Sequence, residues 1–255
     1  MNINLQKSIK MKNVLYYVVA LALIVTVTFS CSKSKDSNKA PAYTCATCKA
    51  TPDAVAANDT KNKGVYKGII IGSSGTIMFN LANSGTTITA VLVIDGVTAN
   101  LTASVSVVDG ATYIAPFTGT LSGTAVSITF SVDANGGSPT VTSFNIPGHA
   151  SATFTIAKET SNALIECFEG TYDSTRPETG TFNLLLSRSL KLFGGASRKT
   201  GSSESHSFHG VINANSELVD SDGGKVIAKL TADALAATFV DGNNATVTVT
   251  GKRTF

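Results

Sequence analysis

The sequence predicts an all-β protein of antiparallel, hairpin-linked strands, and two observations support this. Apolar and polar residues alternate along short runs, as where Val126, Ile128, Phe130 and Val132 alternate with serine and threonine. A period of two gives a strand one buried face and one solvated face. Turn sequences rich in Asn, Asp, Ser and Gly separate the runs, and Asp-Gly between two apolar runs is a strong hairpin signal.

The alternating runs follow one another from Gly64 to the end of the chain. Besides 126–132, their apolar positions are Ile77/Phe79/Leu81, Ile88/Ala90/Leu92/Ile94, Leu101/Ala103/Val105/Val107, Ala150/Ala152/Phe154/Ile156, Phe182/Leu184/Leu186 and Ala245/Val247/Val249. The turn sequences lie at 73–75, 83–85, 95–96, 109–110, 135–137, 222–224 and 241–243. Only 161–166 and 231–237 suggest a helical turn, so we expect little helix.

Four short segments recur in the same order, which predicts two similar halves. The pairs are Tyr66-Lys67-Gly68 with Phe168-Glu169-Gly170, Gly75-Thr76-Ile77 with Gly180-Thr181-Phe182, Phe117-Thr118-Gly119 with Phe208-His209-Gly210, and Phe154-Thr155-Ile156 with Val247-Thr248-Val249. No Pro-rich or charged linker separates the halves, at about 64–163 and 164–255. We therefore expect residues 64–255 to form one sandwich or barrel in which the halves share a core.

The N-terminal stretch resembles a bacterial lipoprotein signal peptide. Lys12 precedes an uncharged apolar run from Val14 to Phe29, and Ser30 and Cys31 follow it. The run is short for a transmembrane helix, which needs about 20 apolar residues. The resemblance implies a signal peptide over residues 1–30 and a lipid anchor on Cys31.

Two neighbouring features refine this prediction. Met11-Lys12-Asn13 is a sufficient basic start by itself, so we expect translation to begin at Met11. The residue after Cys31 is Ser32, whereas an aspartate there resembles an inner-membrane retention signal. The resemblance therefore implies lipid anchoring in the outer membrane.

Residues 31–63 are expected to form a flexible tether, because they are rich in Ser, Lys, Ala and Thr and have no apolar period. The tether contains Cys45-Ala46-Thr47-Cys48-Lys49. Such a pair can be a redox centre, half of a zinc site or a haem attachment sequence, and the Lys49 form resembles the lysine-ligated motif of cytochrome c nitrite reductases. The context of each is missing here, and outside the cytoplasm a disulfide between Cys45 and Cys48 is favoured. The pairing of Cys167 stays open.

The formal charge of +3 does not describe the exported chain. Lys7, Lys10 and Lys12 precede Cys31, which leaves 17 basic residues against 17 acidic ones. A near-neutral chain without a Lys/Arg cluster lacks the basic face that nucleic acid requires. The expected partners are a membrane, through Cys31, and an unidentified envelope protein or glycan.

No constellation of side chains predicts catalysis, a metal site or a cofactor. His206 and His209 are three residues apart, so on a strand they point to opposite faces, and Glu166 and Glu169 are split in the same way. His149 follows a Pro-Gly turn. Neither a Gly-x-Ser-x-Gly elbow nor a phosphate-binding loop is present.

A non-catalytic binding or structural β-domain is the function that these observations favour. Its binding surface is expected on the longest polar connections, at 172–180 and 198–206, because strand scaffolds carry function on loops. The alternatives are an enzyme or metalloprotein that uses His149, His206 or His209, and a glycan-binding module. Trp is absent, which leaves a glycan platform few rings for stacking.

Overall fold

The structure is a computed structural model that describes residues 43–255, so the predicted signal peptide and Cys31 lie outside the described residues. Sixteen strands and one short 3-10 helix, η1 (Ala56–Asn58), make up the described part. Within residues 43–255, no helix is long and apolar enough to cross a membrane.

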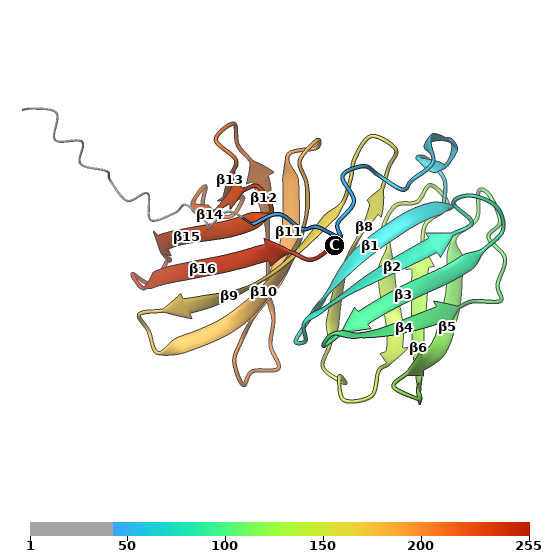
Figure 1. Ribbon diagram of the computed structural model, residues 1–255, viewed down its shortest axis with the longest axis horizontal. Coiled ribbons are helices and arrows are strands. Elements are labelled where there is room, and N and C mark those ends of the chain that lie inside the picture. Colours follow the sequence, from blue (N-terminus) through green and yellow to red (C-terminus); the bar gives the residue numbers. More distant parts are fainter. Residues whose placement is uncertain (1–42) are drawn as a thin grey trace, which may run out of the picture. The chain divides into compact units, whose positions relative to one another are not determined.

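The strands fall into two consecutive sets of eight (Figure 1). The first set is β1 (Gly64–Ile71), β2 (Gly75–Leu81), β3 (Ile88–Ile94), β4 (Val97–Thr102), β5 (Tyr113–Leu121), β6 (Thr124–Val132), β7 (Thr140–Asn145) and β8 (Thr153–Glu159). The second set is β9 (Glu166–Ser174), β10 (Glu178–Ser187), β11 (Leu192–Lys199), β12 (His206–Ile212), β13 (Glu217–Asp220), β14 (Val226–Thr231), β15 (Ala234–Val240) and β16 (Thr246–Arg253).

Both sets form antiparallel sheets with the same cyclic strand order. In the first half the order is β7-β6-β5-β4-β3-β2-β1-β8, so β8 returns to pair with β1 and only the β7–β8 pairing is missing. In the second half β16 pairs with β9 and closes a barrel. The predicted all-β, antiparallel fold of two similar halves is confirmed, and the form is one closed barrel and one nearly closed one.

The turn sequences lie between strands, as predicted. Asp95 and Gly96 both have positive φ, at 48° and 78°, which is the backbone of a tight type I′ hairpin turn. Two expectations are wrong. The strand expected to reach Val107 ends at Thr102, and residues 231–237 enter β15 after a tight turn instead of forming a helical one.

The recurring segments occupy corresponding strands in three of four cases. Their members lie on β1 and β9, on β2 and β10, and on β8 and β16, the first, second and eighth strands of each half. The remaining pair, around Phe117 and Phe208, lies on β5 and β12, which are the fifth and the fourth strand. That pair does not align in the fold.

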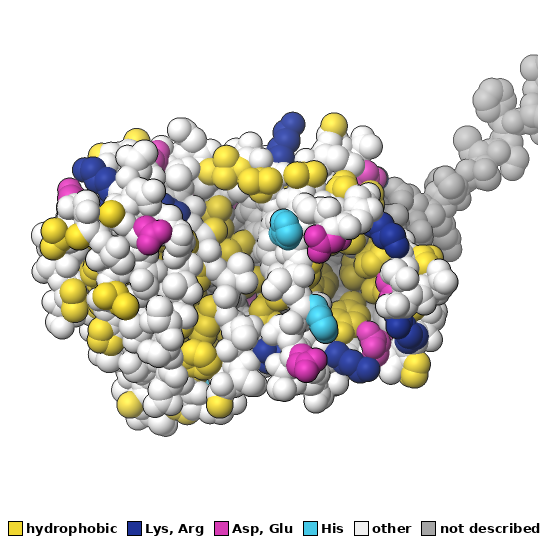
Figure 2. All heavy atoms as spheres, turned by 180° about the vertical axis from the view of Figure 1, so that it is seen from behind, with side chains coloured by type: hydrophobic (Ala, Val, Ile, Leu, Met, Phe, Trp, Pro, Cys, Tyr) yellow, Lys and Arg dark blue, Asp and Glu magenta, His cyan; other side chains and the backbone are white. Residues whose placement is uncertain are grey.

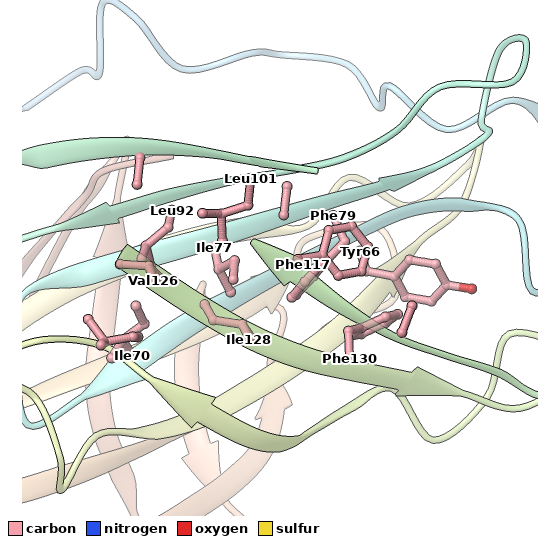
Figure 3. Packing of buried hydrophobic residues seen from close by; sticks show 14 of the residues in the cluster. Tyr66, Ile70, Ile77, Phe79, Leu92, Leu101, Phe117, Val126, Ile128 and Phe130 are labelled. Atoms are coloured by element: carbon pink, nitrogen blue, oxygen red, sulfur yellow. The ribbon is translucent and has the colours of Figure 1, made fainter. Parts of the chain in front are cut away.

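Each half has its own main core. In the first half, Tyr66, Phe79, Phe117 and Phe130 pack ring against ring, with Phe79 and Phe130 stacked at a centroid distance of 4.2 Å (Figure 3). A separate cluster around Phe168 fills part of the second half. The expected shared core is therefore wrong for most of the interior, because each sheet curls around its own apolar face.

A smaller cluster joins the halves. It consists of Ile69 and Ile71 from β1, Cys167 from β9, Leu185 from β10, Ala196 from β11 and the connecting residue Ile165. All eight residues of β1 are buried, because one face of β1 lines the first core and the other covers the second half. A strand buried on both faces fits the apolar run Ile69–Ile71.

The junction also contains a buried ion pair. Lys67 on β1 contacts Glu159 at the end of β8, with 2.6 Å between Nζ and Oε2, and both side chains are almost fully buried. The Glu159 carboxylate accepts two further hydrogen bonds, from the backbone N–H groups of Asp53 and Ile165. The pair thus ties β1 to the segment before the sheet and to the connection between the halves.

The flexible tether expected over 31–63 is wrong from Tyr43 onward, because this segment is bound to the β unit. Asn58 and Asn62 are buried, and their side-chain amides donate to backbone carbonyls of distant loops, at Asn83 and at Val108 and Ala111. The partners lie tens of residues away in sequence. Composition alone could therefore not show that this polar segment is ordered.

Candidate functional site

The second half is a barrel with two unlike ends. At one end lie the turns β9–β10, β11–β12, β13–β14 and β15–β16; at the other lie the remaining turns and the chain end after β16. A cavity of about 490 Å³ lies inside the first end, which we call the mouth. Eight-stranded barrels are about wide enough either to be filled by side chains or to hold one small ligand.

Apolar side chains form the wall of the cavity. They are Tyr172, Phe182, Leu184, Phe208, Leu218, Ile227, Ala228, Phe239, Val247 and Val249, contributed by seven of the barrel strands. Figure 2 shows apolar side chains lying deep in a hollow of this half, with charged side chains around it. A concave apolar wall with a few polar groups at its edge is typical of small-molecule sites, and the volume is within their usual range.

Glycines on the inner face keep the barrel hollow. A Cβ at Gly180 would lie 2.4 Å from the Tyr172 ring across the strand pair, and one at Gly170 would lie 2.3 Å from the Phe182 ring. Because neither glycine has a Cβ, the two rings can approach the backbone of the neighbouring strand closely. In the first half the rings meet one another in the centre and fill it.

The mouth carries more carboxylates than cations. Glu178, Asp220 and Asp241 line it, against Arg176 alone among Lys and Arg. Arg176 forms an ion pair with Asp241, and Glu178 forms one with Lys199, whose Nζ lies 3.2 Å from Oε2. With His206 neutral, the lining residues carry one positive and three negative charges, a net charge of −2.

The nearby pKa shifts agree with a negative mouth. Hydrogen bonds from the Ala245 and Asn243 N–H groups, with a further contribution from Arg176, lower the pKa of Asp241, so this carboxylate stays ionised at neutral pH. Burial raises the pKa of Tyr172, and the negative charge of Glu178 raises it further. The Tyr172 hydroxyl therefore remains a neutral hydrogen-bonding group beside the cavity.

Ion pairs and part of the N-terminal segment lie at the opposite end of the barrel. Glu166 is buried and paired with Arg188 (Nε–Oε1, 2.8 Å), which also reaches Asp233. Asp233 accepts a hydrogen bond from the backbone N–H of Cys45. Cys45 and Cys48 form a disulfide, so a short covalent loop lies against this end.

The histidines and glutamates considered from the sequence do not meet in one site. His206 lines the mouth and its near neighbour His209 does not, as their spacing on β12 requires. Glu166 lies at the end opposite the mouth, whereas Glu169 accepts a hydrogen bond from Ser74 of the first half. Within residues 43–255, no three His, Cys, Asp or Glu side chains gather in a way that could hold a metal ion.

The structure does bring His149 close to a serine and an aspartate. Its Nδ1 lies 2.6 Å from Ser73 Oγ, and its Nε2 lies 3.8 Å from Asp95 Oδ2. The second distance is too long for a hydrogen bond, and the Asp95 side chain is 56% exposed. Ser73 Oγ also donates to the Gly72 carbonyl, and neither Ser73 nor His149 lines the cavity. Asp95 is therefore too far to orient the imidazole by a hydrogen bond, as the third member of a catalytic triad does.

Cys167 is a buried free thiol in the cluster between the halves. Burial raises its pKa to about 12, so almost none of it is thiolate at neutral pH. A reactive cysteine needs an accessible thiolate, and Cys167 is therefore a packing residue.

The sequence interpretation identified part of the mouth and missed the wall. The expected polar connections at 172–180 and 198–206 do lie at the mouth, and they supply Arg176, Glu178 and His206. The wall residues are the apolar positions of ordinary alternating strands, and alternation cannot tell a filled interior from a hollow one. The signal that could have indicated the cavity was the pairing of aromatic residues with Gly170 and Gly180 on neighbouring strands. No protein-family model, curated protein or solved structure matches this chain.

Proposed function

We propose that this protein is an exported, lipid-anchored envelope protein whose second half binds a small, largely apolar ligand without transforming it. The single observation that carries the binding role is the cavity of about 490 Å³ with its apolar wall. Burying apolar ligand surface there is favourable by about 25 cal/mol per Å². The first half, whose interior is filled, acts as a support covering β9, β10 and β11.

The mouth is the entrance that we propose for such a ligand. Glu166, Arg188, Asp233 and the Cys45–Cys48 loop occupy one end, and the four turns of the mouth surround the other. A ligand would enter between these turns and place its apolar part against Phe182, Phe208 and Phe239.

Filling the cavity tests the binding role. Ala228 is buried on β14 and lines the cavity, so Ala228→Phe would place a ring in the space proposed for the ligand. We expect the variant to bind the neutral dye N-phenylnaphthylamine at least tenfold more weakly in fluorescence titrations of the full chain carrying Cys31→Ala. Thr248→Phe, an exposed position of β16, adds the same ring outside the barrel and should leave the affinity unchanged.

The urea midpoint of each variant shows whether it is folded. Val249→Phe is a second filling variant, for use if Ala228→Phe unfolds. Undiminished dye binding in a folded filling variant would contradict the proposed ligand site.

The lipid anchor is tested separately. The N-terminal resemblance supports modification of Cys31, and stable anchoring needs more than one acyl chain. Replacing Cys31 with alanine is expected to move the protein from the membrane to the soluble fraction of a cell lysate. A variant that stays in the membrane pellet after carbonate extraction would refute anchoring through Cys31.

The proposal also gives the histidines considered from the sequence no catalytic role. Alanine at His149 or His209 should leave dye affinity within a factor of about three of the parent, because neither residue lines the cavity. The glycan-binding alternative finds little support in a second hollow, of about 350 Å³, beside β9, β10 and β16. Threonines, Asp173, Gly180 and Tyr172 line it, so it offers one ring for stacking.

A further inference from the structure

The cavity has an uneven distribution of charge, and this distribution selects among apolar ligands. Its deeper wall is uncharged, so it takes the hydrocarbon part of any ligand. All its charged side chains belong to the mouth, on the turn between β9 and β10, the start of β10, the end of β13 and the turn between β15 and β16. A bound amphiphile would therefore place its head group among Arg176, Glu178, Asp220 and Asp241.

We propose that the ligand is an amphiphile with a cationic head group, such as a primary amine, and an apolar tail. This inference rests on the proposed binding function. The lining residues have a net charge of −2, which becomes −1 when Lys199, the ion-pair partner of Glu178, is counted with them, and a cleft with low-dielectric walls concentrates such a potential. The site is thus complementary to an ammonium group and repels a carboxylate.

The one lining cation does not reverse this preference. Arg176 is held by Oδ2 of Asp241, and the other carboxylate oxygen, Oδ1, accepts hydrogen bonds from the N–H groups of Asn243 and Ala245, which fixes the turn before β16. A carboxylate ligand could bind Arg176 only by competing with Asp241, and the displaced Asp241 charge would remain beside it. Lys199 is similarly placed against Glu178.

The remaining charged groups at the mouth do not add a free positive site. Lys225 donates from Nζ to the Val240 carbonyl at 3.1 Å, which directs it toward the backbone of β15. Asp220 at the end of β13 lines the cavity. Asp220 is the carboxylate that we assign to the ligand ammonium.

The test compares three ligands that share one tail. Decylamine, decanol and decanoate are titrated below their micelle concentrations against dye-loaded full chain carrying Cys31→Ala. Decylamine is expected to displace the dye at a concentration at least tenfold lower than decanoate, with decanol between them. Raising the salt concentration should reduce the difference between amine and carboxylate, because screening weakens exposed charges.

Variants then test whether the carboxylates of the mouth cause the preference for the amine. Asp220→Asn should reduce the preference for amine over carboxylate, measured as the ratio of the two displacement concentrations, to about threefold or less. Asp133→Asn, an exposed aspartate after β6 in the first half, is the matched control and should change nothing.

The outcomes separate this inference from the proposed function. Tight binding of decanol with equal or tighter binding of decanoate would overturn the cationic ligand and keep the apolar site. Failure of all three ligands and of the dye would overturn both. An unchanged preference in folded Asp220→Asn would overturn the assignment of Asp220.

Discussion

Replacing Lys67 with methionine is expected to lower the free energy of unfolding by about 3–5 kcal/mol. The substitution removes the ammonium from a pair whose side chains are 2% and 0% exposed, and leaves Glu159 charged in a buried site. Two backbone N–H groups still donate to that carboxylate, so the native geometry persists while the charge lacks its partner. Urea denaturation followed by far-UV circular dichroism measures the loss.

Two controls show whether burial is the cause. Lys199→Met breaks an exposed pair with Glu178 and should cost no more than about 1 kcal/mol. Combining Lys67→Met with Glu159→Gln removes both charges, so the double variant should be more stable than the sum of the single losses predicts. A Lys67→Met protein as stable as the Lys199→Met protein would falsify the buried-pair account.

Phe130→Ala is expected to destabilise the protein by about 3–5 kcal/mol as well, through a cavity in the first core. Phe130 is fully buried and contacts the rings of Tyr66, Phe79 and Phe117, at centroid distances of 5.2, 4.2 and 6.4 Å. Close packing on all sides leaves these neighbours little freedom to collapse into the space. The same urea experiment measures the effect.

Phe208→Ala is the matched substitution in the hollow half. Phe208 is only partly buried, faces the cavity, and has one ring neighbour, Phe193, at 6.4 Å. Part of its surface already lacks packing partners, so its loss should cost clearly less than that of Phe130. Equal losses at the two positions would mean that the interior of the second half is filled, and would count against the ligand cavity.

Sequence periodicity predicted the strands and turns of this protein, because apolar–polar alternation and turn chemistry depend on residues close together in the sequence. Val126, Ile128, Phe130 and Val132 lie buried on β6, and Asp95-Gly96 makes the tight turn between β3 and β4. The spacing of His206 and His209 likewise predicted that the two side chains lie on opposite faces of their strand. Each of these follows from geometry within a single strand or hairpin.

Contacts between residues far apart in the sequence determined the features that periodicity could not predict. The segment 43–63 was expected to be flexible, yet its asparagines and backbone are bound by groups that follow much later in the chain. The closure of β16 onto β9, and the missing pairing of β7 with β8, depend on curvature accumulated over eight strands. The burial of Lys67 likewise depends on partners far along the chain, the Glu159 carboxylate and the Phe255 ring.

The candidate site shows the same division most clearly. The sequence by itself determined that the connections at 172–180 and 198–206 are polar and that Gly170 and Gly180 interrupt apolar runs. Only the tertiary structure decided that Phe182 and Tyr172 lie against those glycines across paired strands, and that a hollow remains between opposite walls. The physical reason is that alternation fixes which face of a strand points inward, whereas the space left inside depends on how the inward side chains of all eight strands fit together.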